Sequence, residues 1–350
     1  MSGTLPSRKL GRTAISVTTL GLGLAPLGNL YRAVSDGEAR DTLQAAVELG
    51  IRYFDTAPYY GFGLSERRAG DGLREEAQAV ISTKVGRLLK PDADVDTSVE
   101  RCGFVSPMPF EPIYDYSYDG ILRSHEDSLQ RLGRGRIDVL FIHDIGKLTH
   151  GDRHNDRLAE LIEGGGLNAL RRLRNEKAVS AIGVGVNEIG ICLDLMERAE
   201  LDVLLLAGRY TLLEQGAIDE LFPLCTDTGV SVVIGGPFNS GILATGATPA
   251  APARYNYGPA PREVRERVTR LEAICRSHGV PLAAAALQFP LAHPAVASVI
   301  PGFANAGEVR SGVEHFRMSI PDSLWSDLRT ESLIDARAPV PGPQAELAAQ

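Results

Sequence analysis

The sequence predicts a (β/α)8 TIM barrel with an N-terminal β-hairpin, and three observations support this α/β fold. Short apolar runs rich in Val, Ile and Leu alternate with longer amphipathic stretches along the 350-residue chain. The short runs show no polar alternation, which is typical of parallel strands covered on both faces. There are eight such runs. Eight strands joined by right-handed helical crossovers form either a closed barrel or an open doubly wound sheet.

A strand is expected wherever one of these apolar runs occurs. Before the first of them, residues 8–17 are expected to form the hairpin, with Gly11 and Arg12 near its turn. The eight strands are expected at Thr19–Leu24, Ile51–Phe54, Ala79–Thr83, Asp138–Ile142, Val179–Val186, Asp202–Leu206, Val230–Ile234 and Val296–Ile300.

The helices between these strands carry signals at their ends. Ser35 is followed three residues later by Glu38, which is the pattern of a capping box, and Gly50 suits the C-terminal end of the same helix. Asp119 is expected to cap a second amphipathic helix that Gly133 closes.

Two stretches between these elements are long and irregular in composition. Val85–Tyr118 is rich in Asp, Pro and Tyr, and Gly235–Pro261 is rich in Gly, Pro and Ala. Loops of this length within a compact domain usually carry function. The tail, about residues 334–350, contains alternating prolines and is expected to be irregular. Because no repeat or linker divides the chain, residues 1–350 are expected to form a single domain.

The composition argues against several kinds of partner. The net charge of -8 and the pI near 5.5 do not suit a nucleic-acid groove or an anionic membrane surface. No apolar run approaches the ~18 residues of a membrane span, and the N-terminal segment lacks the apolar core of a signal peptide. The four cysteines show neither C-x-x-C nor Cys–His metal spacing. We therefore expect reduced thiols, no metal site and a cytoplasmic location.

Four polar residues lie at or just past the ends of three successive predicted strands: Asp55, Tyr60, Lys84 and His143. In a barrel these strand ends share one rim, where loop-borne chemistry assembles. The ordinary pKa of tyrosine, near 10, is too high for efficient proton exchange at neutral pH, and a nearby ammonium lowers it. Lys84 can supply this charge, and Asp55 can hold Lys84 in place. A histidine beside them, His143, can orient a substrate oxygen by a hydrogen bond.

Each of these residues has a simpler interpretation when taken alone. Asp55 could be a turn residue at a strand end, and Tyr60 could be an ordinary aromatic residue of a loop. Their combination with Lys84 and His143 at successive strand ends favours a proton-transfer site.

Over nearly its whole length the sequence resembles the aldo-keto reductase superfamily. The matching segments are Arg8–Thr13, Gly21–Gly23, Asp55–Ala57 with Tyr60-Gly61, Ser65-Glu66, Thr83-Lys84, Ile142-His143, Ile182–Gly185 with Asn187, and Ile300–Gly302. The resemblance implies a closed barrel and a nicotinamide-dependent enzyme. It also implies that Asp55, Tyr60, Lys84 and His143 are the catalytic residues and that Asn187 binds the nicotinamide carboxamide.

Two further segments, Ala207–Leu213 and Gly235–Leu243, are most similar to the D-threo-aldose (L-fucose) and pyridoxal dehydrogenases of this superfamily. The resemblance implies NAD(P)-dependent oxidation of a cyclic hemiacetal, of an aldose or of pyridoxal, to its lactone. One alternative is an NADPH-dependent reductase of small aldehydes or ketones, which would share the same four residues. Another is a nucleotide-binding sensor or accessory subunit with the same barrel, which the intact set of four disfavours.

The resemblance also implies where the cofactor lies. The expected contacts are Gly23, Asp55, Asn187, Gly235, Pro237, Phe238, Gly241, Leu243, Pro301, Gly302, Asn305 and Glu308. Relatives often carry a glutamine where Ala207 stands and a stacking tyrosine where Gly235 stands, so the nicotinamide pocket is altered here. Residues 302–308 lack the Lys or Arg that would hold a 2′-phosphate, and Glu308 would repel one. A carboxylate can instead accept a hydrogen bond from a free 2′-hydroxyl, so NAD is expected over NADP.

The remaining expected partner is a small-molecule substrate. Tyr59 is expected to form a wall of its pocket, and Arg209 is expected either to bind the substrate or to cap a helix. Specificity is expected in Ala25–Val34 and in the two long irregular stretches. The sequence does not indicate an oligomeric state.

Overall fold

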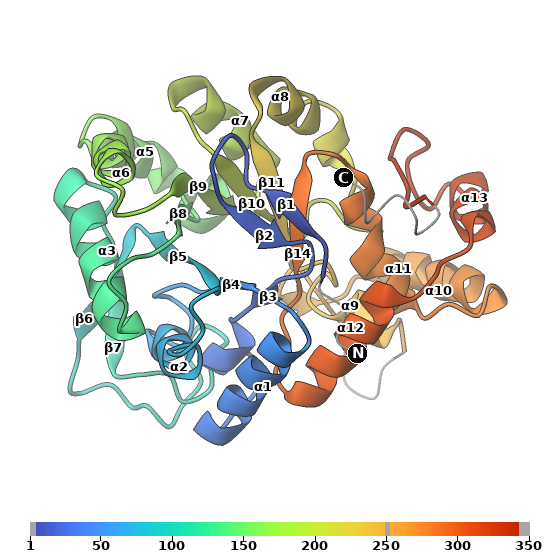
Figure 1. The fold of residues 1–350 in the computed structure, drawn as a ribbon, viewed down its shortest axis with the longest axis horizontal. Coiled ribbons are helices and arrows are strands. Elements are labelled where there is room, and N and C mark those ends of the chain that lie inside the picture. The colour runs from blue at the N-terminus through green and yellow to red at the C-terminus, as the bar shows by residue number, and fades with distance from the viewer. Residues whose placement is uncertain (1–4, 249–252, 343–350) are drawn as a thin grey trace.

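The computed structural model describes residues 5–248 and 253–342, and its centre is a barrel of eight parallel strands (Figure 1). Neighbouring strands pair in the order β3-β4-β5-β8-β9-β10-β11-β14. The two ends of this sheet meet through parallel bridges that join Leu20 to Val299 and Gly23 to Gly302. The barrel therefore closes, and all eight expected strands are confirmed. Their bounds are β3 Leu22–Gly23, β4 Tyr53–Asp55, β5 Val80–Val85, β8 Val139–His143, β9 Ala181–Val186, β10 Val203–Ala207, β11 Ser231–Gly235 and β14 Val296–Ile300.

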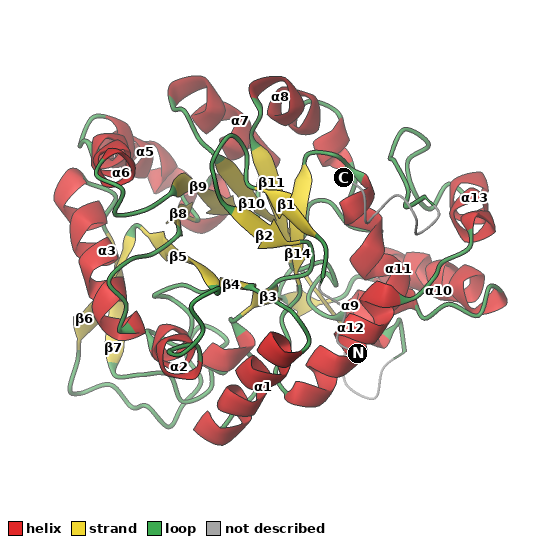
Figure 2. Ribbon diagram, viewed as in Figure 1, coloured by secondary structure: helices red, strands yellow, loops and turns green. Residues whose placement is uncertain are grey.

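Helices surround the barrel on its outer side (Figure 2). The longer ones are α1 Asp36–Glu48, α2 Leu64–Gly72, α3 Tyr118–Leu132, α5 His154–Ile162, α6 Gly166–Asn175, α7 Ile189–Arg198, α8 Leu221–Thr228, α10 Arg262–Ser277, α11 Leu282–Gln288, α12 Ala306–Arg317 and α13 Asp322–Thr330. Two short helices, α4 Lys147–His150 and α9 Ile242–Thr245, lie in the connections after β8 and β11. Within the described ranges, no helix is long and apolar enough to cross a membrane.

The expected helix ends are confirmed with one correction. The Ser35 side chain accepts a hydrogen bond from the Glu38 backbone, and the Glu38 side chain accepts one from the Ser35 backbone, as a capping box requires. Asp119, however, does not cap α3. Ser117 does, because its Oγ accepts a hydrogen bond from the backbone N of Gly120 and the helix begins one residue before Asp119. Gly133 ends α3 in the left-handed conformation, as expected.

The N-terminal hairpin lies across one end of the barrel (Figure 1). Its strands, β1 Ser7–Lys9 and β2 Ser16–Thr18, pair antiparallel. Leu10 and Val17 pack on the barrel interior, and the Arg8 guanidinium donates to the backbone O of Val296 at 2.7 Å. Gly11 has a φ of +54°, and a Cβ there would lie 2.3 Å from the Asp202 carbonyl oxygen, so the turn requires glycine. The hairpin closes the end of the barrel opposite the C-terminal strand ends.

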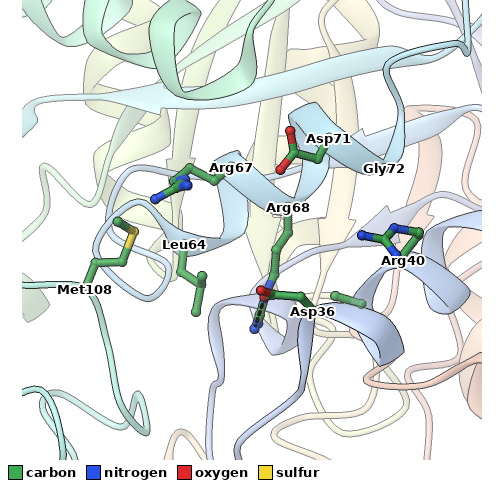
Figure 3. Close-up of a pocket in the computed structure, with 9 residues that line it drawn as sticks. Asp36, Arg40, Leu64, Arg67, Arg68, Asp71, Gly72 and Met108 are labelled. Atoms are coloured by element: carbon green, nitrogen blue, oxygen red, sulfur yellow. Dashed lines mark hydrogen bonds and ion pairs between the residues drawn. The ribbon is translucent and has the colours of Figure 1, made fainter.

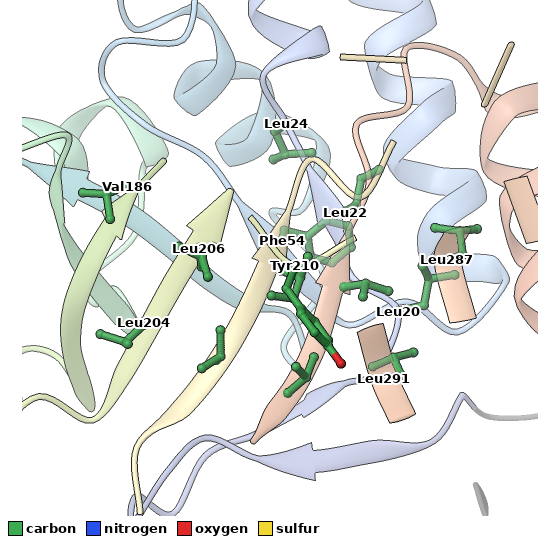
Figure 4. Close-up of a cluster of buried hydrophobic side chains, with 14 of the residues drawn as sticks. Leu20, Leu22, Leu24, Phe54, Val186, Leu204, Leu206, Tyr210, Leu287 and Leu291 are labelled. Atoms are coloured by element: carbon green, nitrogen blue, oxygen red, sulfur yellow. The ribbon is translucent and has the colours of Figure 1, made fainter. Parts of the chain in front are cut away.

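The main hydrophobic core fills the layer between strands and helices. Figure 4 shows Leu22, Phe54 and Leu204 among the side chains that strands contribute to this layer. Leu287 of α11 packs in the same cluster. Since both faces of the sheet are buried, the strands are stiff supports, and groups at their C-terminal ends are held in fixed positions.

The two long stretches are more regular than expected. The first contains an antiparallel hairpin of β6 Arg87–Pro91 and β7 Phe110–Tyr114. The second contains α9 and a short hairpin of β12 Arg254–Tyr255 and β13 Gly258–Pro259. The expectation of irregular loops was wrong here, because two-stranded hairpins accommodate the prolines and glycines that central strands exclude. Residues 334–342 form no helix or strand, and the rest of the expected tail lies outside the described residues.

Candidate active site

The four candidate residues meet at the C-terminal mouth of the barrel. Lys84 is 1% exposed, and its Nζ donates to Asp55 Oδ2 at 2.6 Å and to the backbone O of Thr56 at 2.8 Å. The other Asp55 oxygen, Oδ1, accepts from Ser82 Oγ at 2.7 Å. Burial raises the pKa of Asp55, and the Lys84 charge counteracts part of this rise. The ammonium and the carboxylate thus form a buried, hydrogen-bonded pair fixed to β4 and β5.

Tyr60 lies close to this pair. The Lys84 Nζ is 4.6 Å from the centroid of the Tyr60 ring. Ser65 holds the turn that carries Tyr60, because its backbone N donates to the Tyr60 carbonyl at 3.1 Å and its Oγ donates to the Leu24 carbonyl at 2.8 Å. Gly61, at a φ of +65°, approaches Gly28 so closely that a Cβ would lie 2.4 Å from the Gly28 oxygen. The phenol is therefore positioned by backbone contacts on both sides.

The expectation that Lys84 lowers the pKa of Tyr60 is not met. Burial and the Asp55 carboxylate raise the pKa of Tyr60 well above its ordinary value. The physical reason is that Asp55 neutralises Lys84, so that loss of water around the phenol outweighs the attraction of the ammonium. Tyr60 is consequently a neutral phenol in this structure.

His143 stands beside Tyr60, with ring centroids 5.9 Å apart and the rings nearly perpendicular. Its backbone O accepts from Tyr116 Oη at 2.7 Å. Burial, together with the charges of Arg87 and Lys84, lowers the pKa of His143 well below its ordinary value. The imidazole is therefore neutral, and it can donate a hydrogen bond to a substrate oxygen from one ring nitrogen.

Asn187 follows β9 and completes the mouth. Its Nδ2 donates to the Ala207 carbonyl at 3.1 Å and to Tyr257 Oη at 3.3 Å. Tyr257 comes from the tip of the β12–β13 hairpin and was not expected in the site. Only its place in a long Gly/Pro-rich stretch could have suggested it.

The chain matches the sequence model of the aldo/keto reductase family over residues 19–330. This match covers most of the chain and includes all four residues at the mouth. The chain belongs to the aldo/keto reductase family. It is accordingly a nicotinamide-dependent oxidoreductase, as the sequence predicted.

Two relatives within the family are similar over almost their full length. The chain is 48% identical over 336 residues to the pyridoxal 4-dehydrogenase of Microbacterium luteolum, covering 93% of this chain and 97% of the relative. It is 40% identical over 341 residues to the D-threo-aldose 1-dehydrogenase of a Pseudomonas species, covering 95% and 99%. These relatives confirm the expected branch of the family. The holo form of the aldo-keto reductase AKR11C1 from Bacillus halodurans has the same fold, with a TM-score of 0.72, 26% identity and coverage of 95% and 98%.

The residues expected to hold the adenosine end of the cofactor lie where β14 runs into α12. Asn305 caps this helix by accepting from the Glu308 backbone N at 2.9 Å. Glu308 accepts in return from Asn305 Nδ2 at 2.7 Å and from the Ala304 backbone N at 2.8 Å. Its charge is thus fixed at the N-terminus of α12. Gly302 is bridged to Gly23, and a Cβ at Gly302 would lie 2.9 Å from Pro26 Cγ, so the surface here is made by backbone.

A second group of expected cofactor residues lies in the turn after β11. Gly235 ends the strand, Pro237 and Phe238 form the turn, and Gly241 precedes α9. Leu243 is fully buried in the core, and its backbone N donates to the Phe238 carbonyl at 3.1 Å. Its side chain therefore faces the core of the protein.

The two expected substrate residues have different surroundings. Tyr59 packs against Phe104, with ring centroids 5.5 Å apart, and against His143, with ring centroids 6.2 Å apart, so it lies at the mouth. Arg209 donates to Asn256 Oδ1 at 2.9 Å and thereby holds the tip of the β12–β13 hairpin. It does not cap a helix.

A cavity on the outer side of the barrel is separate from this site. Figure 3 shows Arg40 of α1 and Arg67 and Asp71 of α2 around it. Its volume is about 240 Å³, and none of the four mouth residues lines it. Within the described ranges, no group of His, Cys, Asp or Glu is arranged to hold a metal ion.

Proposed function

We propose that this protein is an NAD-dependent dehydrogenase that oxidises the cyclic hemiacetal of an aldose or of pyridoxal to its lactone. The observation that carries the proposal is the buried Lys84–Asp55 pair beside Tyr60, with a neutral His143 at its side. The identity shared with a pyridoxal 4-dehydrogenase and a D-threo-aldose 1-dehydrogenase supports this substrate class.

The residues at the mouth suit a nicotinamide cofactor. Asn187 offers an amide at the opening, and its Oδ1 accepts no hydrogen bond from the described residues, so we assign it to the carboxamide. When bound, oxidised nicotinamide supplies the acceptor for the hydride that leaves the hemiacetal carbon. We place the nucleotide contacts at the backbone surface of Gly23 and Gly302, at the turn after β11, and at Asn305 and Glu308.

Proton transfer is assigned to the chain's own residues. His143 donates a hydrogen bond to the hemiacetal oxygen and orients the hydroxyl toward Tyr60. Once Tyr60 has released its own proton to solvent, its phenolate oxygen takes the hydroxyl proton, and the electron pair of the substrate C–H bond leaves as hydride. Since burial keeps the Tyr60 pKa high, this step needs more positive charge near the phenol than Lys84 alone supplies. A bound oxidised nicotinamide would supply a positive charge of the required sign.

A substrate screen tests this function. We expect absorbance at 340 nm to rise when NAD is mixed with at least one of a panel of aldoses of both hands and pyridoxal. We expect a higher kcat/KM with NAD than with NADP, because the fixed carboxylate of Glu308 repels a 2′-phosphate. Turnover confined to NADPH and simple aldehydes or ketones would instead support the reductase function.

Tyr257 provides a test of the carboxamide site that needs no substrate. Both hydrogens of Asn187 Nδ2 are already donated, one of them to Tyr257 Oη. In a Tyr257→Phe variant, one of these hydrogens becomes free to donate to the carboxamide oxygen. This variant is therefore expected to bind NAD about 2- to 10-fold more tightly, the usual worth of one neutral hydrogen bond. Calorimetric titration measures this. Tyr118→Phe is the matched control, because among the described residues the Tyr118 hydroxyl accepts only from Arg172 on α6. Weaker binding than in this control would contradict the assignment.

A further inference from the structure

A second ion pair, between a buried arginine and a half-buried aspartate, lies beside the four catalytic candidates. Arg87 Nη2 is 2.5 Å from Asp144 Oδ2, and the two side chains are 4% and 21% exposed. Arg87 begins β6, shortly after Lys84. Asp144 comes directly after His143 at the end of β8. The pair therefore joins two of the strand ends that form the mouth.

The backbone conformation of Asp144 is uncommon and directs its side chain. Its φ is +46°, in the left-handed region that residues other than glycine seldom adopt. Its backbone N still donates to the Gly185 carbonyl at 2.9 Å, so the conformation is held by β9. As a result the carboxylate turns back toward the imidazole, and Oδ2 lies 3.4 Å from His143 Nε2. Strained residues of this kind cluster at functional sites.

Arg87 is immobilised by the aromatic rings beside its guanidinium. Its guanidinium carbon lies 3.9 Å from the Tyr59 ring centroid and 5.2 Å from that of Tyr114. Its Nε and Nη1 are buried and have no hydrogen-bond partner within the described residues. Within the described residues, Asp144 is thus the one hydrogen-bonded partner of the Arg87 guanidinium.

Asp144 retains a free acceptor. Oδ2 contacts Arg87, whereas Oδ1 accepts no hydrogen bond from any described residue. The Asp144 side chain is 21% exposed, and Oδ1 reaches solvent at the mouth. A carboxylate oxygen beside the substrate-orienting histidine needs a donor once a substrate displaces water from it.

We propose that Asp144 is a substrate-binding residue, that Arg87 positions it, and that Oδ1 accepts a hydrogen bond from a second hydroxyl carried by the substrate close to its reacting hemiacetal. This inference rests on the proposed function, because His143 marks where the hemiacetal oxygen lies. The site then prefers polyhydroxylated or phenolic hemiacetals. A substrate without a second donor leaves Oδ1 dehydrated and without a hydrogen bond, although Oδ2 still pairs with Arg87. Polar pockets discriminate strongly against substrates that leave such an atom without a partner.

Three probes with the same reacting group test this directly. L-Fucose and pyridoxal carry further hydroxyls, whereas 2-hydroxytetrahydropyran is a cyclic hemiacetal without them. In Asp144→Asn, kcat/KM for L-fucose or pyridoxal is expected to fall about 10- to 100-fold, mainly through KM, since a hydrogen bond to a charged acceptor is lost. For 2-hydroxytetrahydropyran the expected change is less than about 3-fold, because this probe never made the bond.

A matched control separates binding from stability. Asp202→Asn removes the carboxylate that pairs with Arg174 at 3.0 Å, at the opposite end of the barrel. Any decrease in kcat/KM in this variant is expected to be the same for all three probes. If Asp144→Asn does not fold, because Arg87 keeps a buried unpaired charge, the double variant Arg87→Met/Asp144→Leu removes both charges at once. It is expected to show the same selective loss.

A binding measurement decides the inference even without turnover. L-Fucose and pyridoxal are titrated into NAD-loaded Tyr60→Phe, with and without Asp144→Asn, and the second variant is expected to raise their Kd about 10-fold or more. Any of three results would overturn the role of Asp144. These are equal decreases in kcat/KM for all three probes in Asp144→Asn, unchanged Kd values, or no binding of either hydroxylated probe. Failure of wild-type protein to oxidise any probe would count against the proposed function, while the binding titrations would still decide the role of Asp144.

Discussion

Replacing Lys84 with methionine is expected to lower the free energy of unfolding by about 3–5 kcal/mol and to abolish most activity. The Lys84 and Asp55 side chains are 1% and 3% exposed. Removing the ammonium therefore leaves a carboxylate with no counter-charge in a site that excludes water. Urea unfolding followed by circular dichroism measures the loss as a lower midpoint with an unchanged slope.

The double variant Lys84→Met/Asp55→Leu distinguishes stability from chemistry. It removes both charges, so most of the lost free energy of unfolding is expected to return, as for other buried pairs replaced by apolar residues. Activity is not expected to return, because Tyr60 would then lie beside two apolar side chains and would have no ammonium near its ring. If the double variant is as unstable as the single one, the unpaired carboxylate is not the cause of the lost free energy of unfolding. If it recovers activity, the pair has no part in proton transfer.

Replacing Tyr60 with phenylalanine is expected to lower kcat by about 10²- to 10⁴-fold, the range that a positioned proton-transfer group contributes. Stability should change little, because the Tyr60 hydroxyl has no hydrogen-bond partner in the described ranges, whereas its backbone contacts persist. NAD affinity should also be kept. The measurement is a steady-state kcat beside a calorimetric Kd for NAD, with Tyr118→Phe as the matched control.

The strand positions and the four mouth residues were predictable because both depend on local pattern. A strand that is buried on both faces appears in the sequence as an unbroken apolar run, and the polar residue at its end marks where the strand stops. Asp55, Lys84 and His143 are found in this way. Their convergence then follows from the barrel itself, in which all parallel strands end at one rim.

Features that depend on distant pairing were not predictable. Asp144 and Arg87 are 57 positions apart, and Asn187 and Tyr257 are 70 apart, with no periodic pattern to connect them. The direction of the Tyr60 pKa was predicted wrongly for a related reason. The sequence shows that a lysine is near, but it does not show that Asp55 neutralises the lysine or that water is excluded.

The pH dependence of hemiacetal oxidation tests the role of Tyr60 most directly. With its pKa raised by burial, Tyr60 is protonated throughout the neutral range, and the fraction able to accept a proton grows with pH. Log kcat/KM for oxidation is therefore expected to rise from pH 6 upward with a slope approaching one, and to be nearly flat in Tyr60→Phe. A wild-type profile that falls with pH, or a Tyr60→Phe variant with the same rising slope, would contradict proton transfer by Tyr60.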